Sequence, residues 1–483
     1  MSSCRTVRPR KAAVSAGSAG IRQQRFLVVG LGRAGTAMAR FLISRGAVVF
    51  GFDESEDVVR SRMVNRLRRS GMRLAQDSVP RSTGWAVVSP GIGDQHPVVR
   101  KLRSLRVPVL DELDLASSLL PGPIVAVTGT NGKSTTTALI ARILEEAGYR
   151  VFCGGNLAPG QPLSEALLLP AQEYYVVEAS SFQLERARLL KPAVAVILNL
   201  SPDHLNRHRT MACYAESKFR ILDRQDRGDI AVLNYDDQLL LPARNRGRAE
   251  RCYFSMRHRV RGAYLVRKAI WFRGERLCAV SKLVLLGRHN VQNALAAVAA
   301  ASALGVRAAA VRRALAAFRG LEHRLEQVAV IDGVTYVNNS MCTNPAAGAQ
   351  SLAALVGAGL PGKAHRVVLI AGGREKGLPI EEYVEAMCRF AKRVMLLGES
   401  GERLGRKLTC RGFGSFDLCS DLRSAIGAAR AAARPGDTVL FSPGFASFDQ
   451  FADFQARGRA FRLAVKRMCP VGSGGTGFGA TRD

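Results

Sequence analysis

One stretch of eight residues has the types and spacing needed to hold the phosphates of a nucleotide. It reads TGTNGKST at 128–135, directly after an apolar run and before a helical pattern that extends to Ala147. Backbone N–H groups of such a turn surround phosphate oxygens, Lys133 neutralises their charge, and the Ser134 hydroxyl reaches Mg²⁺. The usual pattern has glycine where Val127 stands, but the turn itself is intact. The stretch predicts ATP or GTP binding through Gly129, Thr130, Asn131, Gly132, Lys133, Ser134 and Thr135.

Two further polar residues follow predicted strands of the same region. Glu178 ends the run Tyr-Tyr-Val-Val, and His204 comes after the strand predicted at 194–199. An open α/β sheet presents its ligand crevice at the carboxyl ends of its strands. A carboxylate and an imidazole placed there would hold a metal ion or position a substrate.

A glycine-rich turn also occurs near the start of the chain. Gly30-Leu-Gly-Arg-Ala-Gly35 follows an apolar strand, and Asp53 ends the next strand about 20 residues later. Glycines allow close backbone approach to an anion, and the acidic residue can bind a ribose or a base. From these residues alone, NAD binding and a turn selected only for packing are both open.

These motifs require a framework of strands alternating with helices. The pattern predicts strands at 26–30, 47–52, 124–128, 175–177, 194–199, 366–371, 393–398 and 437–442. Such alternation indicates an α/β protein with mostly parallel sheets. We predict a Rossmann-like domain over 25–111, a central P-loop ATPase-type domain over 112–320 and a Rossmann-like C-terminal domain over 321–468.

The composition excludes several classes of protein. With 483 residues, 47% of them hydrophobic and 23% charged, the chain is neither disordered nor a coiled coil. Its ten cysteines form no C-x-x-C pair, which argues against a zinc ribbon or a disulfide framework. No apolar run reaches the roughly 20 residues that cross a bilayer. We therefore expect a cytoplasmic protein that does not bind membranes.

The formal charge of +31 attracts anions of every kind without selecting one. Compositional drift of a whole genome explains it equally well. Residues 1–24 are basic and free of acids, which is typical of a disordered extension or of an organellar transit peptide. The glycine-rich tail 469–483 is also predicted to be disordered.

The motifs, taken together, resemble the Mur ligases of peptidoglycan synthesis. Besides TGTNGKST, the matching segments are EASSFQLE at 178–185, NLSPDHLNR at 199–207, GRHNVQNA at 287–294, GLEHR at 320–324 and SPGFASFDQF at 442–451. The resemblance extends from about Arg25 to Val465.

This resemblance implies an ATP-dependent amide ligase that proceeds through an acyl phosphate, in the branch that adds D-glutamate to UDP-N-acetylmuramoyl-L-alanine. It also implies a monomer with no nucleic-acid partner and one or two Mg²⁺ ions. The implied catalytic residues are Lys133, Glu178, His204 and Lys218. The implied metal ligands are Ser134, Glu178, Ser180, His204 and Lys218, the last as a carbamylated lysine; without the resemblance, Lys218 would be read as an exposed helix residue.

The same resemblance assigns the remaining binding residues. For the nucleotide it adds Asn290, Asn293, Arg324 and Asn339. The first glycine-rich turn then binds the UDP group of the substrate instead of NAD. The implied substrate residues are Arg33, Ala34, Asp53, Ser89, Gly91, Asn156, Thr343, Lys376, Ser447 and Phe454.

One motif departs from the family pattern. The family reads NDSKATN where this chain reads NNSMCTN at 338–344, so an aspartate becomes Asn339 and a lysine becomes Met341. In the family that lysine helps to hold the incoming glutamate. Arg374 is a candidate replacement, because a guanidinium suits a carboxylate.

Two other functions remain open at this stage. A related ligase would use another acceptor, such as L-glutamate, another amino acid or a folate-type substrate. A nucleic-acid-binding protein that has lost catalysis would explain the charge of +31. That reading leaves the co-occurrence of Lys133, Glu178, His204 and Lys218 without a reason.

Overall fold

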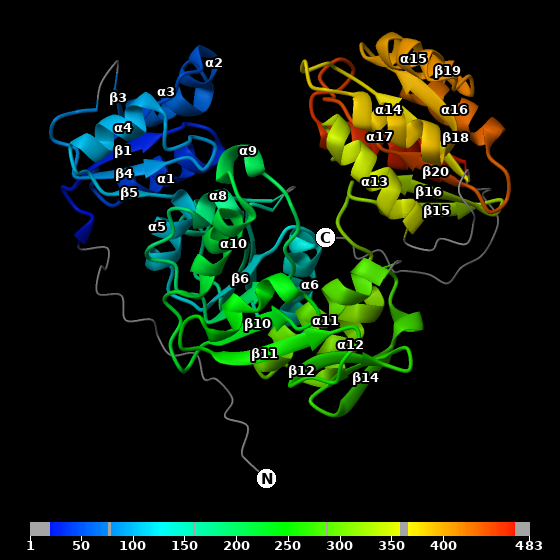
Figure 1. Cartoon of the computed structure of the whole chain (residues 1–483). Coiled ribbons are helices and arrows are strands. Elements are labelled where there is room, and N and C mark those ends of the chain that lie inside the picture. Colours follow the sequence, from blue (N-terminus) through cyan, green and yellow to red (C-terminus); the bar gives the residue numbers. More distant parts are fainter. Residues whose placement is uncertain (1–19, 76–78, 158–159, 286–287, 358–365, 469–483) are drawn as a thin grey trace, which may run out of the picture. The chain divides into compact units, whose positions relative to one another are not determined.

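The computed structural model describes residues 20–75, 79–157, 160–285, 288–357 and 366–468. The chain divides into two compact units (Figure 1). Unit 1 comprises residues 1–285 and 289–318, and unit 2 comprises 286–288 and 319–483. Each unit is an α/β structure with a parallel-rich sheet framework, as the sequence predicts.

Unit 1 begins with a five-stranded sheet in the order β3-β2-β1-β4-β5, in which every pair is parallel. The strands are β1 (Arg25–Val29), β2 (Val48–Phe52), β3 (Arg73–Leu74), β4 (Trp85–Val88) and β5 (Val109–Leu110). The helices are α1 (Arg33–Ser44), α2 (Glu56–Val59), α3 (Arg62–Arg69), α4 (Pro97–Ser104) and α5 (Glu112–Leu119). We call residues 25–119 the N-terminal segment.

The rest of unit 1 is built on a nine-stranded sheet in the order β14-β13-β12-β11-β10-β9-β6-β8-β7. Its strands are β6 (Ile124–Thr128), β7 (Val151–Gly155), β8 (Tyr174–Glu178), β9 (Val194–Ile197), β10 (Ile230–Asn234), β11 (Glu250–Ser255), β12 (Gly262–Val266), β13 (Ala269–Phe272) and β14 (Glu275–Ala279). Its helices are α6 (Lys133–Glu146), α7 (Leu163–Ala166), α8 (Ser181–Leu184), α9 (Leu205–His208), α10 (Met211–Phe219), α11 (Arg288–Ala303) and α12 (Ala308–Ala317), with short 3-10 turns at Arg220–Leu222, Gln238–Leu240, Pro242–Asn245 and Val280–Lys282. We call residues 124–318 the central segment.

Unit 2 contains a six-stranded sheet in the order β15-β16-β20-β17-β18-β19. Its strands are β15 (Glu326–Ile331), β16 (Val334–Asn338), β17 (Val367–Gly372), β18 (Ala391–Leu397), β19 (Phe416–Leu418) and β20 (Thr438–Phe441). Its helices are α13 (Pro345–Gly357), α14 (Glu381–Phe390), α15 (Gly401–Cys410), α16 (Leu422–Ala432) and α17 (Phe454–Arg467).

The strands that lead into the site are apolar because both faces of their sheet are covered. All five residues of β6 and of β8 are buried, as are all four of β9. Parallel strands with helices on both faces have such continuous apolar runs. The alanines of helix α11 pack in the core beside β6 and β9.

Some sequence-based expectations need correction. The predicted extension 1–24 is too long, because Ile21 is buried in the core and Val48 N–H donates to Gln24 O; the rest of that extension and the tail 469–483 lie outside the described residues. The antiparallel pairs β12–β13, β13–β14 and β15–β16 were not predicted.

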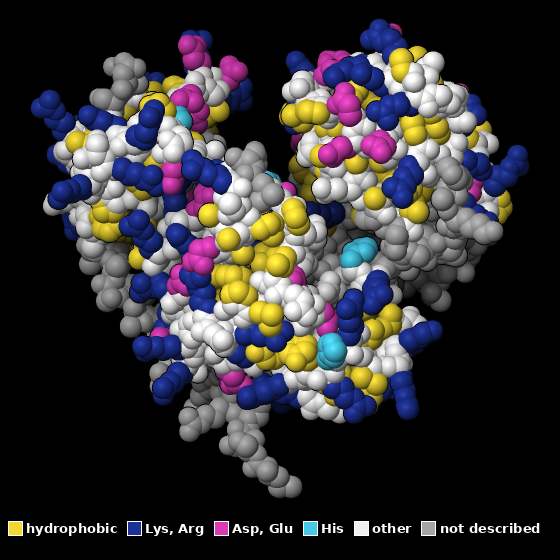
Figure 2. Space-filling view, viewed as in Figure 1, with side chains coloured by type: hydrophobic (Ala, Val, Ile, Leu, Met, Phe, Trp, Pro, Cys, Tyr) yellow, Lys and Arg dark blue, Asp and Glu magenta, His cyan; other side chains and the backbone are white. Residues whose placement is uncertain are grey.

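Each predicted domain contains one of the three sheets, but contacts group the first two sheets into unit 1. The boundary between 111 and 112 therefore stays a prediction. All eight cysteines among the described residues are free thiols. Within the described ranges, no helix is both long and apolar enough to span a membrane. On the visible face, Lys and Arg are scattered over both units (Figure 2).

Candidate active site

The phosphate-binding turn joins β6 to α6 in a conformation that requires glycine. Gly132 immediately precedes α6 with a φ of +83°, in the left-handed region. A Cβ at this position would lie 2.1 Å from Asn293 Oδ1, and one at Gly129 would lie 2.9 Å from the Leu198 Cβ. The turn therefore packs against α11 and β9 with no room for a side chain, and Asn293 is brought next to it.

Two residues absent from the predicted site fix the shape of this turn. Asn199, just after β9, accepts from the N–H groups of Thr130 (2.9 Å, through its carbonyl) and Asn131 (2.8 Å, through Oδ1). Its Nδ2 donates to Asn131 O at 3.1 Å. The Tyr214 hydroxyl lies 3.1 Å from Thr130 Oγ1. The signal for Asn199 was available, since it opens the motif NLSPDHLNR.

Two lysines meet at one carbonyl oxygen of the turn. Lys133 Nζ donates to Gly129 O at 3.1 Å and to Thr130 O at 2.9 Å. Lys218 Nζ, from α10, donates to the same Gly129 O at 2.8 Å. The side chain of Lys218 is only 1% exposed, so reading it as an exposed helix lysine is wrong. Burial, followed by repulsion from Lys133, lowers the pKa of Lys218 to about 7.

A hydroxyl and a carboxylate form a buried pair beside the turn. Ser134 Oγ donates to Glu178 Oε2 at 2.5 Å, and both residues are buried. The other oxygen, Oε1, accepts from Asn156 Nδ2 at 2.8 Å. β8 and β7 place Glu178 and Asn156 at neighbouring strand ends. The structure thus brings together Lys133, Ser134, Asn156, Glu178 and Lys218.

Two other predicted metal ligands lie in different surroundings. His204 is about half exposed, with Nε2 3.5 Å from Asp203 Oδ2 and its ring 4.8 Å from that of Phe182. Its φ of +52° is unusual for a residue other than glycine. Ser180 caps α8, where its Oγ accepts from Gln183 N–H at 3.2 Å. Among the described residues, neither His204 nor Ser180 forms a hydrogen bond or an ion pair with Glu178.

The glycine-rich turn of the N-terminal segment is equally tight. Gly30 has a φ of +91°, and its Cβ would lie 2.7 Å from the Ser89 Cβ. Asp53 Oδ2 accepts from Leu31 N–H at 2.6 Å. The predicted residues Asp53, Ser89 and Gly91 therefore belong to the same edge of this sheet as the turn.

Residues 33 and 34 contact the central segment. Arg33 donates through Nε to Glu165 Oε1 at 3.0 Å and through Nη1 to Gly160 O at 2.7 Å. Ala34 O accepts from Ser164 Oγ at 3.2 Å. The Arg33 side chain is 61% exposed, so this ion pair contributes little stability and leaves the guanidinium within reach of a ligand.

Arg207 joins the two segments but was not predicted as a site residue. Its Nη1 donates to Pro90 O at 2.7 Å, and its Nη2 donates to Glu185 Oε2 at 2.7 Å. Its guanidinium carbon lies 4.2 Å from the centre of the Phe182 ring. Pro90 stands between the predicted residues Ser89 and Gly91, so Arg207 fixes the loop that carries them.

The predicted nucleotide residues divide between the two units. Asn293 Nδ2 donates to Asn290 Oδ1 at 3.1 Å in α11 of unit 1. Arg324 and Asn339 belong to unit 2. Asn339 is buried there, and its Nδ2 donates to Ser351 Oγ and Ser442 Oγ, each at 3.0 Å, while Oδ1 accepts from Leu325 N–H. Both the oxygen and the nitrogen of its side-chain amide are therefore hydrogen-bonded within unit 2.

Unit 2 has a small cationic pocket that two of the predicted substrate residues line. Its lining includes Thr343, Arg374, Lys376, Arg403 and Phe445. Arg374 and Ala446 exchange backbone hydrogen bonds of 2.9 and 3.3 Å, which place the pocket next to Ser447. Ser447 itself is 2% exposed, and Phe454 begins α17.

The residues that line this pocket carry more positive than negative charge. Glu375, an acid in the pocket lining, accepts from Arg403 Nη1 at 2.8 Å. Arg374 and Lys376 form no ion pair with any residue in the described ranges. Met341 does not line the pocket, and its N–H donates to His323 O at 3.0 Å. Two cations are therefore available to an anionic ligand.

A buried arginine holds the walls of this pocket, and sequence reasoning missed it. Arg457, 1% exposed, donates to Ser340 Oγ (3.1 Å), Ser340 O (3.0 Å), Phe445 O (3.1 Å from both Nη atoms) and Ala446 O (3.1 Å). Burial lowers its pKa to about 10, so it stays charged at neutral pH. The position lies beyond the last quoted motif, and no pattern in a single sequence marks it.

The donor set beside the turn suits Mg²⁺ better than a transition metal. The described part of the chain contains no cluster of three or more His, Cys, Asp or Glu side chains that could hold a metal ion. Mg²⁺ needs few protein ligands, because it keeps several waters and binds substrate phosphates. The Ser134 hydroxyl and the Glu178 carboxylate are oxygen donors of the required kind.

Comparison with known proteins gives two matches to family profiles. The Mur ligase middle domain matches residues 127–301, and the Mur ligase, glutamate ligase domain matches residues 323–445. The chain is 39% identical to the UDP-N-acetylmuramoylalanine--D-glutamate ligase of Pelotomaculum thermopropionicum, covering 92% of this chain and 97% of that one. The enzyme of the same name from Myxococcus xanthus is 37% identical, with coverages of 92% and 98%.

Solved structures show the same fold at lower identity. The UDP-N-acetylmuramate-alanine ligase of Thermotoga maritima aligns with a TM-score of 0.56 and 20% identity, covering 92% of this chain and 100% of that one. The MurF ligase of Thermotoga maritima, in complex with ADP, gives a TM-score of 0.53 at 18% identity, with coverages of 97% and 100%.

Proposed function

The chain belongs to the Mur ligase family, and from this membership we infer that it is an ATP-dependent acid–amino-acid ligase that adds D-glutamate to UDP-N-acetylmuramoyl-L-alanine. One observation carries the inference: the phosphate turn, the Ser134–Glu178 pair and Lys218 are assembled at one sheet edge. The relatives that match over nine-tenths of this chain are named as D-glutamate ligases of this kind. Turnover with another acceptor, such as L-glutamate, is the alternative that an experiment must exclude. The reaction belongs to peptidoglycan precursor synthesis, which we place in the cytoplasm, where ATP is available.

Activation of the substrate carboxylate is the first chemical task. A carboxylate is a poor electrophile with a poor leaving group, and transfer of the γ-phosphoryl group to it solves both problems. Two anions must meet for this to occur, so positive charge has to be concentrated where they meet. Lys133 supplies that charge at the turn. Attack by the amine of the amino acid on the acyl phosphate then expels inorganic phosphate.

We assign the metal site to Ser134 and Glu178, with Lys218 beside them. Bound Mg²⁺ would neutralise charge that develops on the transferred phosphoryl group. The pKa of about 7 for Lys218 supports carbamylation, because only a neutral amine reacts with CO₂. A carbamate would replace a buried cation by an anionic oxygen donor. His204 and Ser180 are kept as expected ligands of a second ion.

The N-terminal segment is assigned to the UDP group. Close packing at Gly30 leaves no room for a side chain at that position, and the Leu31 N–H of the turn donates to Asp53. Glycines in such a turn allow an anion to approach the backbone closely. Asp53, Ser89 and Gly91 stand at the same edge, and Arg33, the first residue of α1 after the turn, is largely exposed. Asn156, which donates to Glu178, is assigned to the substrate between the two segments.

We assign the acceptor to the cationic pocket of unit 2. D-glutamate brings two carboxylates, and the pocket offers Arg374 and Lys376 in excess of the paired Arg403. Arg374 would take over the role that a lysine at position 341 has in the family, since a guanidinium can bind a carboxylate through two parallel hydrogen bonds. Thr343, Ser447 and Phe454 complete the proposed set.

The experiment that tests this function is phosphate release with ATP, Mg²⁺ and UDP-N-acetylmuramoyl-L-alanine across a panel of amino acids. We expect turnover with D-glutamate and none with L-glutamate, D-aspartate or meso-diaminopimelate. Turnover with another acceptor only would retain the ligase chemistry and overturn the acceptor. No turnover with any acceptor would overturn the ligase assignment itself.

A further inference from the structure

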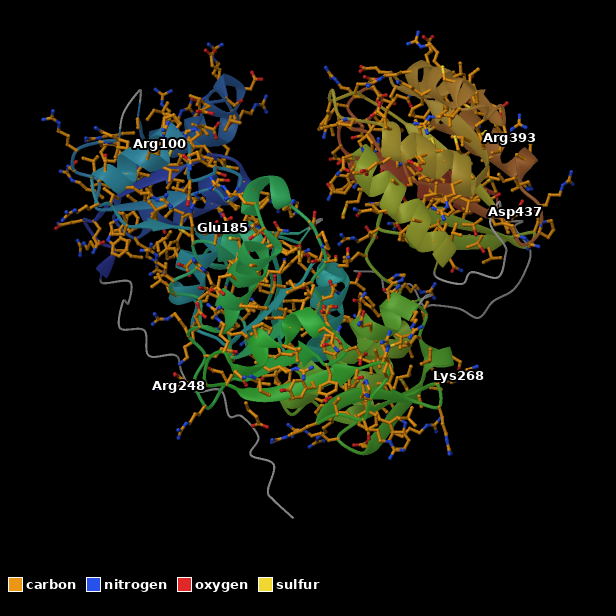
Figure 3. All side chains as sticks on the ribbon, in the orientation of Figure 1. Arg100, Glu185, Arg248, Lys268, Arg393 and Asp437 are labelled. Atoms are coloured by element: carbon orange, nitrogen blue, oxygen red, sulfur yellow. The ribbon has the colours of Figure 1, made fainter. Side chains whose placement is uncertain are left out.

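A cavity of about 480 Å³ lies between the N-terminal and central segments of unit 1, apart from the phosphate turn. Its walls come from the loop after β4, the end of α4, the start of β5, the residues after α8 and the 3-10 turn after α10. The lining residues with charge are Asp94, Arg103, Arg106, Glu185, Arg186, Arg188 and Arg220. Figure 3 labels Glu185, where the two segments adjoin, and Arg248, which lies away from that junction.

Both acids in the lining already have cationic partners. Asp94 pairs through Oδ1 with Arg186 at 3.0 Å and through Oδ2 with Arg103. Glu185 pairs with Arg207 at 2.7 Å and with His208 at 3.2 Å. Neither Arg207 nor His208 lines the cavity.

The arginines outnumber these acids, and two of them form no ion pair within the described ranges. Arg106 and Arg188 are exposed and form no ion pair with any residue that the structure describes. Arg220 donates to the backbone oxygen of Glu185, which carries no formal charge. The charged residues that line the cavity therefore carry a net positive charge, which Asp114, behind Arg188, offsets only in part.

Arg186 holds one wall of the cavity in place. Its side chain is 8% exposed, and its Nη2 donates to Ile92 O at 2.6 Å and to Asp94 Oδ1 at 3.0 Å. Its Nη1 is buried and has no accessible surface, so it does not face the cavity. The buried carboxyl of Asp111 interacts electrostatically with Arg186, although the two form no ion pair.

We propose that this cavity binds a phosphorylated small molecule through Arg106 and Arg188. Guanidinium groups bind phosphate oxygens in pairs of parallel hydrogen bonds, and several of them around one anion favour phosphate over a single carboxylate. The volume exceeds what inorganic phosphate needs, so a pyrophosphate or a larger phosphate ester fits.

An occupant would act on the loop that presents Ser89 and Gly91. Ile92 and Asp94, which Arg186 holds, directly follow that loop, and Arg207 holds Pro90 within it. Binding in the cavity would therefore tighten the connection between the two segments. For the proposed ligase, this makes the site an effector site for the UDP substrate, a consequence that rests on the proposed function, whereas the binding itself does not.

The test is isothermal titration of the full-length chain with pyrophosphate, in a Lys133→Met background that disables the phosphate turn. We expect binding to persist in this background and to weaken at least tenfold when Arg106→Ser and Arg188→Ser are added. These two side chains are exposed, so their loss leaves the fold intact. The matched control, Arg100→Ser with Arg248→Ser, removes the same charge from exposed positions outside the cavity and should change the Kd less than twofold.

Two results would overturn the proposal. One is loss of all pyrophosphate binding in the Lys133→Met chain, which would place the anion at the turn. The other is equal weakening by the cavity pair and the control pair, which would mean that only overall charge matters. Either result leaves the phosphate-release assay unaffected, so failure here is distinguishable from failure of the proposed function.

Discussion

Replacement of Arg457 by methionine would test whether the buried guanidinium holds the acceptor pocket together. Of its acceptors, Ala446 O keeps the N–H of Arg374, and Ser340 Oγ keeps its bond to Phe454 O. Phe445 O and Ser340 O lose the bonds that Arg457 gives them. Each buried carbonyl left unsatisfied costs about 1–3 kcal/mol, so we expect unit 2 to lose about 2–6 kcal/mol of stability.

Hydrogen exchange of peptides from β20 and α17 measures this loss within unit 2, without assuming two-state unfolding of the whole chain. We also expect the KM for D-glutamate to rise at least tenfold, with the KM for ATP changed less than twofold. Arg457→Lys keeps the charge and should give an intermediate result. Arg459→Met, at an exposed position of the same helix, is the control. If Arg457→Met and Arg459→Met both cost less than about 1 kcal/mol, the reasoning fails.

Three other predictions concern the turn, a buried acid and the acceptor. Gly132→Ala places a Cβ 2.1 Å from Asn293 Oδ1, so kcat/KM for ATP should fall about 100-fold; unchanged ATP kinetics would contradict this. Burial raises the pKa of Glu112 to about 7, so its folded form takes up a proton and stability falls as pH rises from about 4.5 to 7. Glu112→Gln should remove this slope and stabilise the chain by about 2–3 kcal/mol above pH 7, measured by urea unfolding, with no gain at pH 4.5. Arg374→Ala should raise the KM for D-glutamate more than tenfold; an unchanged KM would remove Arg374 from the pocket.

The sequence was most informative where chemistry constrains consecutive residues. The turn 129–132 needs glycines at fixed positions, so its place between β6 and α6 could be read directly. Glu178 was predicted because it follows a buried strand, and the parallel pairing of β8 with β6 brings it to the turn. Alternating strands and helices likewise predicted the α/β framework.

Features that depend on contacts between distant segments could not be read in this way. Lys218 is ordinary in a helix, and only the packing of α10 against the turn buries it. Arg457 resembles its exposed neighbour Arg459 until α17 packs on the sheet. Ile21 was placed in the predicted disordered extension but is buried in the core. A single apolar residue within a basic stretch gives no sign that it is buried.

The most direct test of the central claim is isotope transfer from substrate to phosphate. UDP-N-acetylmuramoyl-L-alanine labelled with ¹⁸O in the alanine carboxylate is incubated with ATP, Mg²⁺ and D-glutamate, and the products are analysed by mass spectrometry. We predict that each turnover forms one amide bond between the alanine carbonyl and the D-glutamate nitrogen and moves one ¹⁸O atom into inorganic phosphate, as an acyl phosphate requires. Amide formation with unlabelled phosphate, or ATP hydrolysis with no amide, would contradict the account.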